Sequence, residues 1–128
     1  MMDLTHGDSS IELIDSTIFI TLKGAFNEYG VQVWFEKLKT IVNQLHGKPF
    51  TILINYLEAD GATPEAFQVA NKYNSWLCEQ NLTAKAIVTS PILAAIDLAQ
   101  INEKNRKQQN YKYFITVPSA LEWLKTQK

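Results

Sequence analysis

Apolar side chains follow two periods along this chain, and segments of the two kinds alternate. Short runs rich in β-branched and aromatic residues predict strands. The runs span Ile11–Ile14, Thr17–Leu22, Phe50–Tyr56, Ala84–Thr89 and Tyr111–Val117. Only Asp15 and Ser16 separate the first two runs, so the pattern predicts a two-residue hairpin between them.

Between the strands, apolar residues recur at the three- and four-residue spacing of helices. The clearest series is Val31, Phe35, Leu38, Val42 and Leu45, followed by Gly47 as a left-handed stop. Further helices are predicted from Pro64 to about Gln80, from Pro91 to Asn110 and from Pro118 onward. Thr63 is expected to cap the helix at Pro64, and Ser119 has the capping-box spacing to Glu122.

The predicted order is β-β-α-β-α-β-α-β-α, which gives an α/β fold. Its sheet is expected to have five strands, mostly parallel, with one antiparallel edge strand. Right-handed crossovers between strands taken in sequential order would keep the helices on one face. Residues 1–10 are polar and are expected to form a flexible segment, and residues 11–128 are expected to form a single domain.

Side chains alternate along the predicted strands, although strands covered by helices on both faces are usually apolar throughout. One set is apolar and comprises Ile18, Ile20, Leu22, Ile52, Ile54, Ala86, Val88, Tyr113 and Ile115. The other set is polar and includes Thr17, Thr21, Thr51, Asn55, Lys85, Thr89, Lys112 and Thr116. We therefore expect most helices to pack on the apolar side only.

The polar side also carries one large apolar residue per strand. These residues are Phe19, Leu53, Ile87 and Phe114. Leaving such a stripe in water costs several kcal/mol, at about 25 cal/mol per Å². Either Ile11, Leu13 or the N-terminal segment covers it, or it is an interface for a partner or a second subunit. Tyr73 and Trp76, beside the core line of their helix, form another candidate interface.

Composition and charge exclude several classes of protein. The net charge is −1 and no run of five like charges occurs, which argues against nucleic-acid binding. No apolar run approaches the roughly 20 residues that span a bilayer, and the N-terminus lacks signal-peptide features. We therefore expect a cytoplasmic location and no membrane insertion. Cys78 is the only cysteine, so a disulfide within one chain is excluded.

Polar residues gather where the strand from Phe50 is expected to end. Glu58, Asp60, Gly61 and Thr63 occupy this loop, at the end of a strand where open α/β sheets place their sites. Because no nucleophile–base set accompanies the two acids, no catalytic residue is expected. No nucleotide or metal motif is present, so neither a cofactor nor a metal is expected.

The element order and the ending Ala120-Leu121-Glu122-Trp123-Leu124 resemble the STAS-like (SpoIIAA-like) family of anti-sigma-factor antagonists and their relatives. The A-L-E-W-L ending is similar to a variant branch of unknown function. The resemblance implies a β/α superhelix that binds a protein without catalysis. In the antagonists, a serine in an Asp-Ser-Ser-Gly loop is phosphorylated. The corresponding residues here are Asp60-Gly61-Ala62-Thr63. Since capping explains Thr63, its phosphorylation is not expected.

Three functions follow, in order of preference. The first is a non-catalytic regulatory module that binds another protein or itself as a homodimer. The second is a carrier of a small apolar molecule or a lipid, because a related β/α architecture binds apolar ligands and the helices are widely apolar. The third is an enzyme that uses Glu58 and Asp60.

Overall fold

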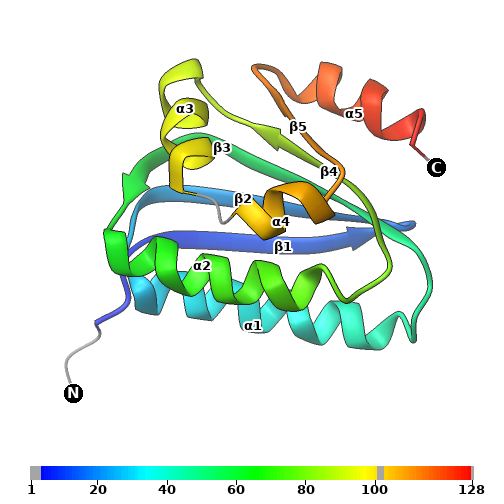
Figure 1. Ribbon diagram of the computed structural model, residues 1–128, viewed down its shortest axis with the longest axis horizontal. Helices are drawn as coiled ribbons and strands as arrows, with labels where there is room; N and C mark the ends of the chain where they lie inside the picture. Colours follow the sequence, from blue (N-terminus) through cyan, green and yellow to red (C-terminus); the bar gives the residue numbers. More distant parts are fainter. Residues whose placement is uncertain (1–3, 101–102, 128) are drawn as a thin grey trace.

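The computed structural model describes residues 4–100 and 103–127 and contains a five-stranded sheet (Figure 1). The strands are β1 (Asp8–Ile14), β2 (Thr17–Phe26), β3 (Phe50–Ala62), β4 (Leu82–Val88) and β5 (Tyr111–Phe114). They lie in the order β1-β2-β3-β4-β5, with β1 antiparallel to β2 and all other neighbours parallel. The predicted fold class, hairpin and sequential strand order are confirmed.

Five helices are formed by the described residues. They are α1 (Glu28–Gln44), α2 (Pro64–Leu77), α3 (Pro91–Gln100), α4 (Glu103–Gln108) and α5 (Val117–Lys125). Figure 1 shows α1 and α2 side by side along the sheet, with α5 apart from them. Thr63 caps α2 as predicted, because its hydroxyl accepts a hydrogen bond from the N–H of Ala66 at 3.1 Å.

Residues 4–10 make backbone contacts with the rest of the chain. Strand β1 begins at Asp8, so residues 8–10 of the predicted flexible segment pair with β2. The Asn27 side chain, which caps α1, also donates to the carbonyl of Leu4 at 2.7 Å and accepts from the N–H of His6 at 3.1 Å. A Cβ added at Gly30 would lie 2.0 Å from the His6 carbonyl oxygen, so glycine permits this close approach.

Three predicted boundaries are wrong. The residues expected to form a loop after Tyr56 continue β3 to Ala62, because they pair with the last residues of β2. The single helix predicted from Pro91 is two helices, α3 and α4. Strand β5 ends at Phe114, since Thr116 caps α5 by accepting from the N–H of Ser119 at 3.3 Å. Ser119 is therefore not the cap.

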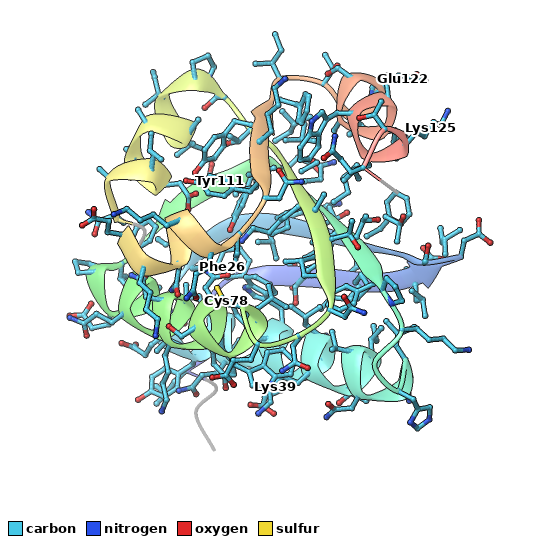
Figure 2. All side chains as sticks on the ribbon, turned by 45° about the vertical axis from the view of Figure 1, so that its right-hand side comes forward. Phe26, Lys39, Cys78, Tyr111, Glu122 and Lys125 are labelled. Carbon is cyan, nitrogen blue, oxygen red and sulfur yellow. The ribbon has the colours of Figure 1, made fainter. Side chains whose placement is uncertain are left out.

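Helices cover both faces of the sheet, which corrects the expectation of one-sided packing. The α1/α2 face carries Ile20, Ile52 and Ile54, which form one buried cluster with residues of α1 and α2. The α5 face carries Leu53 and Ala86, which form a second cluster with Ala120 and Leu124 of α5. Figure 2 shows Glu122 and Lys125 projecting outward from α5, away from this contact. The α5 face also keeps exposed polar side chains, among them Ser10, Glu12 and Lys23 in β1 and β2 and Lys112 in β5.

The side chains of β4 are one position out of phase with the prediction. Leu53 pairs with Ala86 and Ile54 pairs with Ile87, so Ile87 lies on the α1/α2 face. The predicted stripe of Phe19, Leu53, Ile87 and Phe114 therefore loses Ile87, and its other members pack against α5. Residues 84–89 are all buried. A strand buried on both faces gives no alternation from which its phase can be inferred.

Candidate functional site

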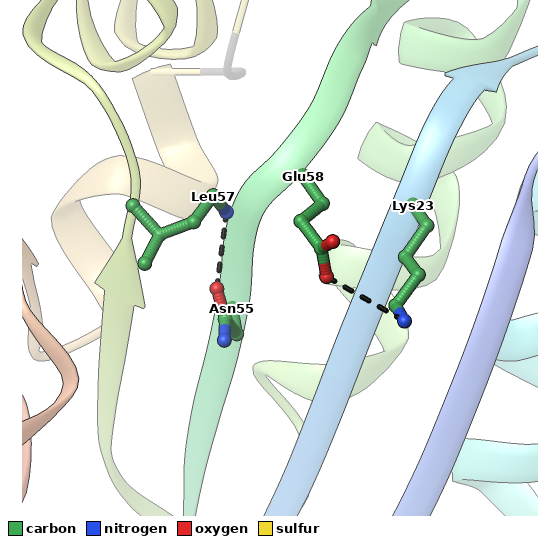
Figure 3. Close-up of polar contacts among 4 residues, drawn as sticks. All are labelled: Lys23, Asn55, Leu57 and Glu58. Carbon is green, nitrogen blue, oxygen red and sulfur yellow. Dashed lines mark hydrogen bonds and ion pairs between the residues drawn. The ribbon is translucent and has the colours of Figure 1, made fainter.

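The pairing of β3 with β2 shifts register twice near the end of β3. The predicted site residues lie at and after these shifts. Thr21 pairs with Asn55 but Lys23 pairs with Glu58, so β3 carries an extra residue there, and a second shift follows near Asp60. Such bulges re-aim side chains. The Asn55 side chain accepts the N–H of Leu57 at 3.0 Å across the first shift (Figure 3).

The predicted residues do not converge on one point. Glu58 pairs with Lys23 at 3.5 Å across β2 and β3, and both side chains are well exposed (Figure 3). Asp60 and Gly61 instead lie at the wall of a cavity on the α1/α2 face, and Thr63 is occupied by its cap. Glu58 therefore has an ion-pair partner on the surface, whereas Asp60 borders the cavity.

A cavity of about 340 Å³ lies between the α1/α2 face and the helices. Its walls come from β2, β3 and β4 on the sheet side and from α1, α2 and α3 on the helix side. Most of the lining is apolar, for example Leu22, Ile52, Ile54 and Leu77. The volume falls within the range of about 300–1,000 Å³ that is typical of small-molecule pockets.

Lys85 of β4 is the buried cation in the wall of this cavity, with only 3% of its surface exposed. Its ammonium donates to the Asn74 side-chain oxygen at 3.3 Å and lies 6.0 Å from the centre of the Tyr111 ring. Among the described residues, no carboxylate lies within ion-pair distance of it. Burial lowers the pKa of Lys85 to about 8, although the charges of Asp97 and Cys78 act in the opposite direction.

Two tyrosines border the same region. The Tyr113 hydroxyl donates to the Asp97 carboxylate at 2.5 Å, which joins β5 to α3. Burial and the nearby Asp97 charge raise the pKa of both Tyr113 and Tyr56. Both phenols therefore stay protonated at neutral pH. Among the described residues, the Asp97 carboxylate accepts a short hydrogen bond from Tyr113 and makes no ion pair with Lys85.

A network of buried amides fastens α4 to α2 behind Lys85. Asn105 is fully buried, donates to the Asn71 carbonyl at 3.0 Å and accepts from the Ser75 hydroxyl at 3.1 Å. Gln109 donates to the Asn74 side chain at 3.4 Å. Polar residues on a short segment at 102–110 gave no signal of burial, so the sequence did not reveal this network.

Two residues of the cavity wall each have a buried polar atom that finds no hydrogen-bond partner among the described residues. The atoms are the indole Nε1 of Trp34 and the hydroxyl Oγ1 of Thr89. Buried polar groups are nearly always satisfied, so each exception calls for an explanation. Sequence reasoning did not single out Trp34, Lys85 or Asn74, because an alternating pattern marks faces and does not mark cavities.

Tyr73 and Trp76, one of the predicted interfaces, lie along the seam between α1 and α2. The Tyr73 ring stacks on Phe35 with centroids 4.7 Å apart. Its hydroxyl donates to Glu36 at 2.6 Å, and this hydrogen bond raises the pKa of Tyr73 to about 12. Lys39 lies 5.7 Å from the Trp76 ring centre. Packing within the chain thus accounts for both aromatic residues.

No family model and no curated protein matches the sequence. Solved structures do match the fold. A protein of the DUF3478 family with a SpoIIAA-like fold from Shewanella loihica has a TM-score of 0.69 at 19% identity, over 97% of this chain and 98% of that chain. An anti-sigma factor antagonist from Mycobacterium paratuberculosis has a TM-score of 0.66 at 10% identity, over 98% and 99%.

The anti-sigma factor antagonist SpoIIAA, in its unphosphorylated form, has a TM-score of 0.59 at 13% identity, over 92% of this chain and 98% of that chain. Within the described residues, no helix has the length and apolar character to cross a membrane. The three likenesses show that this chain adopts the SpoIIAA-like fold, as the resemblance in its sequence predicted.

Proposed function

We propose that this chain is a non-catalytic STAS-like module that binds another protein at the carboxyl edge of its sheet. Three large apolar side chains are exposed at that edge. They are Leu57 in β3 (50% exposed), Ile92 just after β4 (75%) and Ile115 just after β5 (68%). Exposed apolar groups gathered on one edge are typical of protein contacts. This observation carries the proposal.

The likeness to two anti-sigma factor antagonists supports a protein partner, since such proteins are named for acting against another protein. Residues 60–63, which correspond to the antagonists' regulated loop, lie at the same edge as Leu57. Glu58 and Asp60 would then form part of the polar rim of the contact. The proposal moves the interface away from Phe19, Leu53 and Phe114, which pack against α5.

A photo-crosslinking amino acid at position 115, introduced in the native host, tests this proposal. We expect a covalent adduct with one protein at position 115 and none at the control position Gln44, which is exposed at the end of α1. With that protein purified, Ile115→Asp should weaken binding about tenfold or more, and Gln44→Asp should not. Absence of an adduct would contradict the proposal, and an adduct with a second copy of the chain would replace the partner by self-association.

A second candidate function is a carrier of an apolar molecule, and the cavity beside Lys85 favours it. A cavity of about 340 Å³ with two unpartnered polar atoms is built like a ligand pocket. Native mass spectrometry of protein purified from its own host should find a retained ligand mass. Protein that carries no added mass under every growth condition would count against this function.

A further inference from the structure

We propose that the cavity binds an apolar molecule with a carboxylate head group, and that Lys85 receives the carboxylate. The inference rests on the carrier function and names the chemistry of its ligand. Two features of the cavity carry it: its apolar walls and the buried ammonium of Lys85.

The apolar walls determine the body of the ligand. Sheet residues such as Ile20, Leu22 and Ile52 face helix residues such as Leu38 and Leu77 across the cavity. A polar body would lose its hydration there without gaining hydrogen bonds. An alkyl chain instead exchanges water contact for apolar contact, at about 25 cal/mol per Å² of buried surface.

The ammonium of Lys85 determines the head group. An ammonium has three donors, and within the described part of the chain Lys85 makes one hydrogen bond, to Asn74 at 3.3 Å. A buried cation is expensive unless an anion pairs with it. The carboxylate of Asp97 lines the same cavity but is held by the Tyr113 hydroxyl at 2.5 Å. Asp97 acts on Lys85 only from beyond ion-pair distance, and no other described carboxylate pairs with it, so a ligand carboxylate would supply a direct partner.

The other polar atoms of the wall point to the same chemistry. The Trp34 indole is a donor only, and the Thr89 hydroxyl can donate. A carboxylate oxygen only accepts hydrogen bonds, so either donor could bond to one. A dianionic phosphate fits less well, because Asp60 and Asp97 also lie in the wall and would repel a second negative charge.

The rim offers a route for entry. Asp60 and Gly61 lie at the end of β3, and Ile96 and Gln100 come from α3. Helix α3 has no buried residue, so it is the least anchored wall of the cavity. An apolar tail can enter beside α3 and carry its head group to Lys85.

Isothermal titration calorimetry with decanoate and with the neutral 1-decanol tests the assignment. We expect wild-type protein to bind decanoate about tenfold or more tightly than decanol, because the charged pair contributes only to decanoate. Lys85→Met keeps the length of the side chain and removes the charge. It should lower the affinity for decanoate about tenfold or more and change the affinity for decanol by less than about twofold. Lys37→Met, on the exposed face of α1, should change neither.

A cavity-filling pair locates the binding. Ala70→Leu narrows the cavity and should weaken both molecules, whereas Gln68→Leu adds the same side chain on the exposed side of α2 and should weaken neither. If wild-type protein binds neither molecule, both the carrier function and this inference are wrong. If decanoate and decanol bind equally and Lys85→Met changes nothing, the carboxylate assignment is wrong and the carrier function stands.

Discussion

The two faces of the sheet are covered by different means. On the α1/α2 face, two long helices with large aromatic side chains, including Trp34 and Phe35, stand over the strands, and a cavity of about 340 Å³ remains beneath them. On the α5 face, a helix of nine residues places Ala120 in one buried cluster with Ala84 and Ala86 of β4. Small side chains permit a close approach, whereas large side chains hold a helix away from the sheet.

The difference in packing suggests that the α5 face serves stability and the α1/α2 face serves binding. The core residues under α5, among them Ala86, Ala120 and Leu124, are almost completely buried. The α1/α2 face contains Lys85, Asp97 and the unpartnered Trp34 indole around its cavity. A well-packed core stabilises the fold, whereas a cavity with unpartnered polar atoms sacrifices stability at a site that is suited to a ligand.

The largest effect is expected for Leu124→Ala on the α5 face. Leu124 is almost completely buried, and its loss leaves a cavity that the short helix cannot close. The free energy of unfolding, measured by urea denaturation, should fall by about 2–5 kcal/mol. Ile92→Ala, at a side chain that is 75% exposed, should change it by less than about 0.5 kcal/mol. Equal losses of unfolding free energy in the two variants would mean that Leu124 is not buried between α5 and the sheet.

On the other face, Lys85→Met should stabilise the protein. The pKa of Lys85 falls from 10.5 to about 8 in the folded state, so the buried charge is unfavourable below pH 8. The 2.5-unit difference (10.5 minus 8) corresponds to about 3 kcal/mol at most. Because a lowered lysine pKa makes wild-type stability rise with pH between about 8 and 10.5, the advantage of the variant should shrink over that range.

The ionisable groups around Lys85 do not change the prediction that Lys85→Met is the more stable protein below pH 8. Asp97 and Cys78 both favour the charged lysine, and their effect is included in its pKa. Tyr113 and Tyr56 titrate above their usual range and are present in both proteins, so they cancel in the difference. Urea unfolding of both proteins from pH 7 to pH 10.5 provides the comparison. A variant less stable than wild type at every pH would contradict the account.

Adding one leucine to each face compares the two directly. Ala86→Leu on the α5 face should lower the free energy of unfolding by about 1–3 kcal/mol, because Ala86 is fully buried in the cluster under α5. Ala70 lines the cavity, so Ala70→Leu should lower the free energy of unfolding by less than about 0.5 kcal/mol. Urea denaturation measures both values. Similar costs at the two positions would show that the faces are packed alike.

The strand order was predictable from sequence, and the packing of the faces was not. β-Branched runs alternating with helical spacing determined the parallel sheet and its hairpin. Lys85, however, is a residue type that is almost never fully buried, so it was assigned to a solvent face, and this assignment shifted Ile87 to the wrong face as well. The apolar residues of α3 and the polar residues of α4 follow one another without a glycine or proline between them, so the boundary between the two helices was not predicted.

The site was predictable only in part. Asp60 was expected near a site because it follows a strand, and it does lie at the cavity wall. Glu58 pairs with Lys23 on the surface, because the bulges in β3 separate the two acids. A cavity depends on how far helices stand from a sheet, and no local pattern encodes that distance. Ala120 and Leu124, the buried residues of α5, are four positions apart, and this helical spacing marks the side of α5 that packs on the sheet.

The smallest effect is expected at the exposed ion pair between Lys23 and Glu58. Both side chains are more than half exposed, so water and salt screen their attraction. Lys23→Met should lower the free energy of unfolding by less than about 1 kcal/mol, and added salt should reduce that loss further. Urea denaturation at low and high salt measures both. A loss as large as that of Leu124→Ala would mean that this open part of the sheet is covered.

Xenon binding in crystals of the chain tests the contrast between the two faces most directly, because xenon occupies dry apolar cavities. The account predicts a xenon atom beneath α1 and α2, in contact with residues such as Ile52 and Ala70. It predicts none between Ala86 and Leu124. Xenon beneath α5, or none beneath α1 and α2, would contradict it.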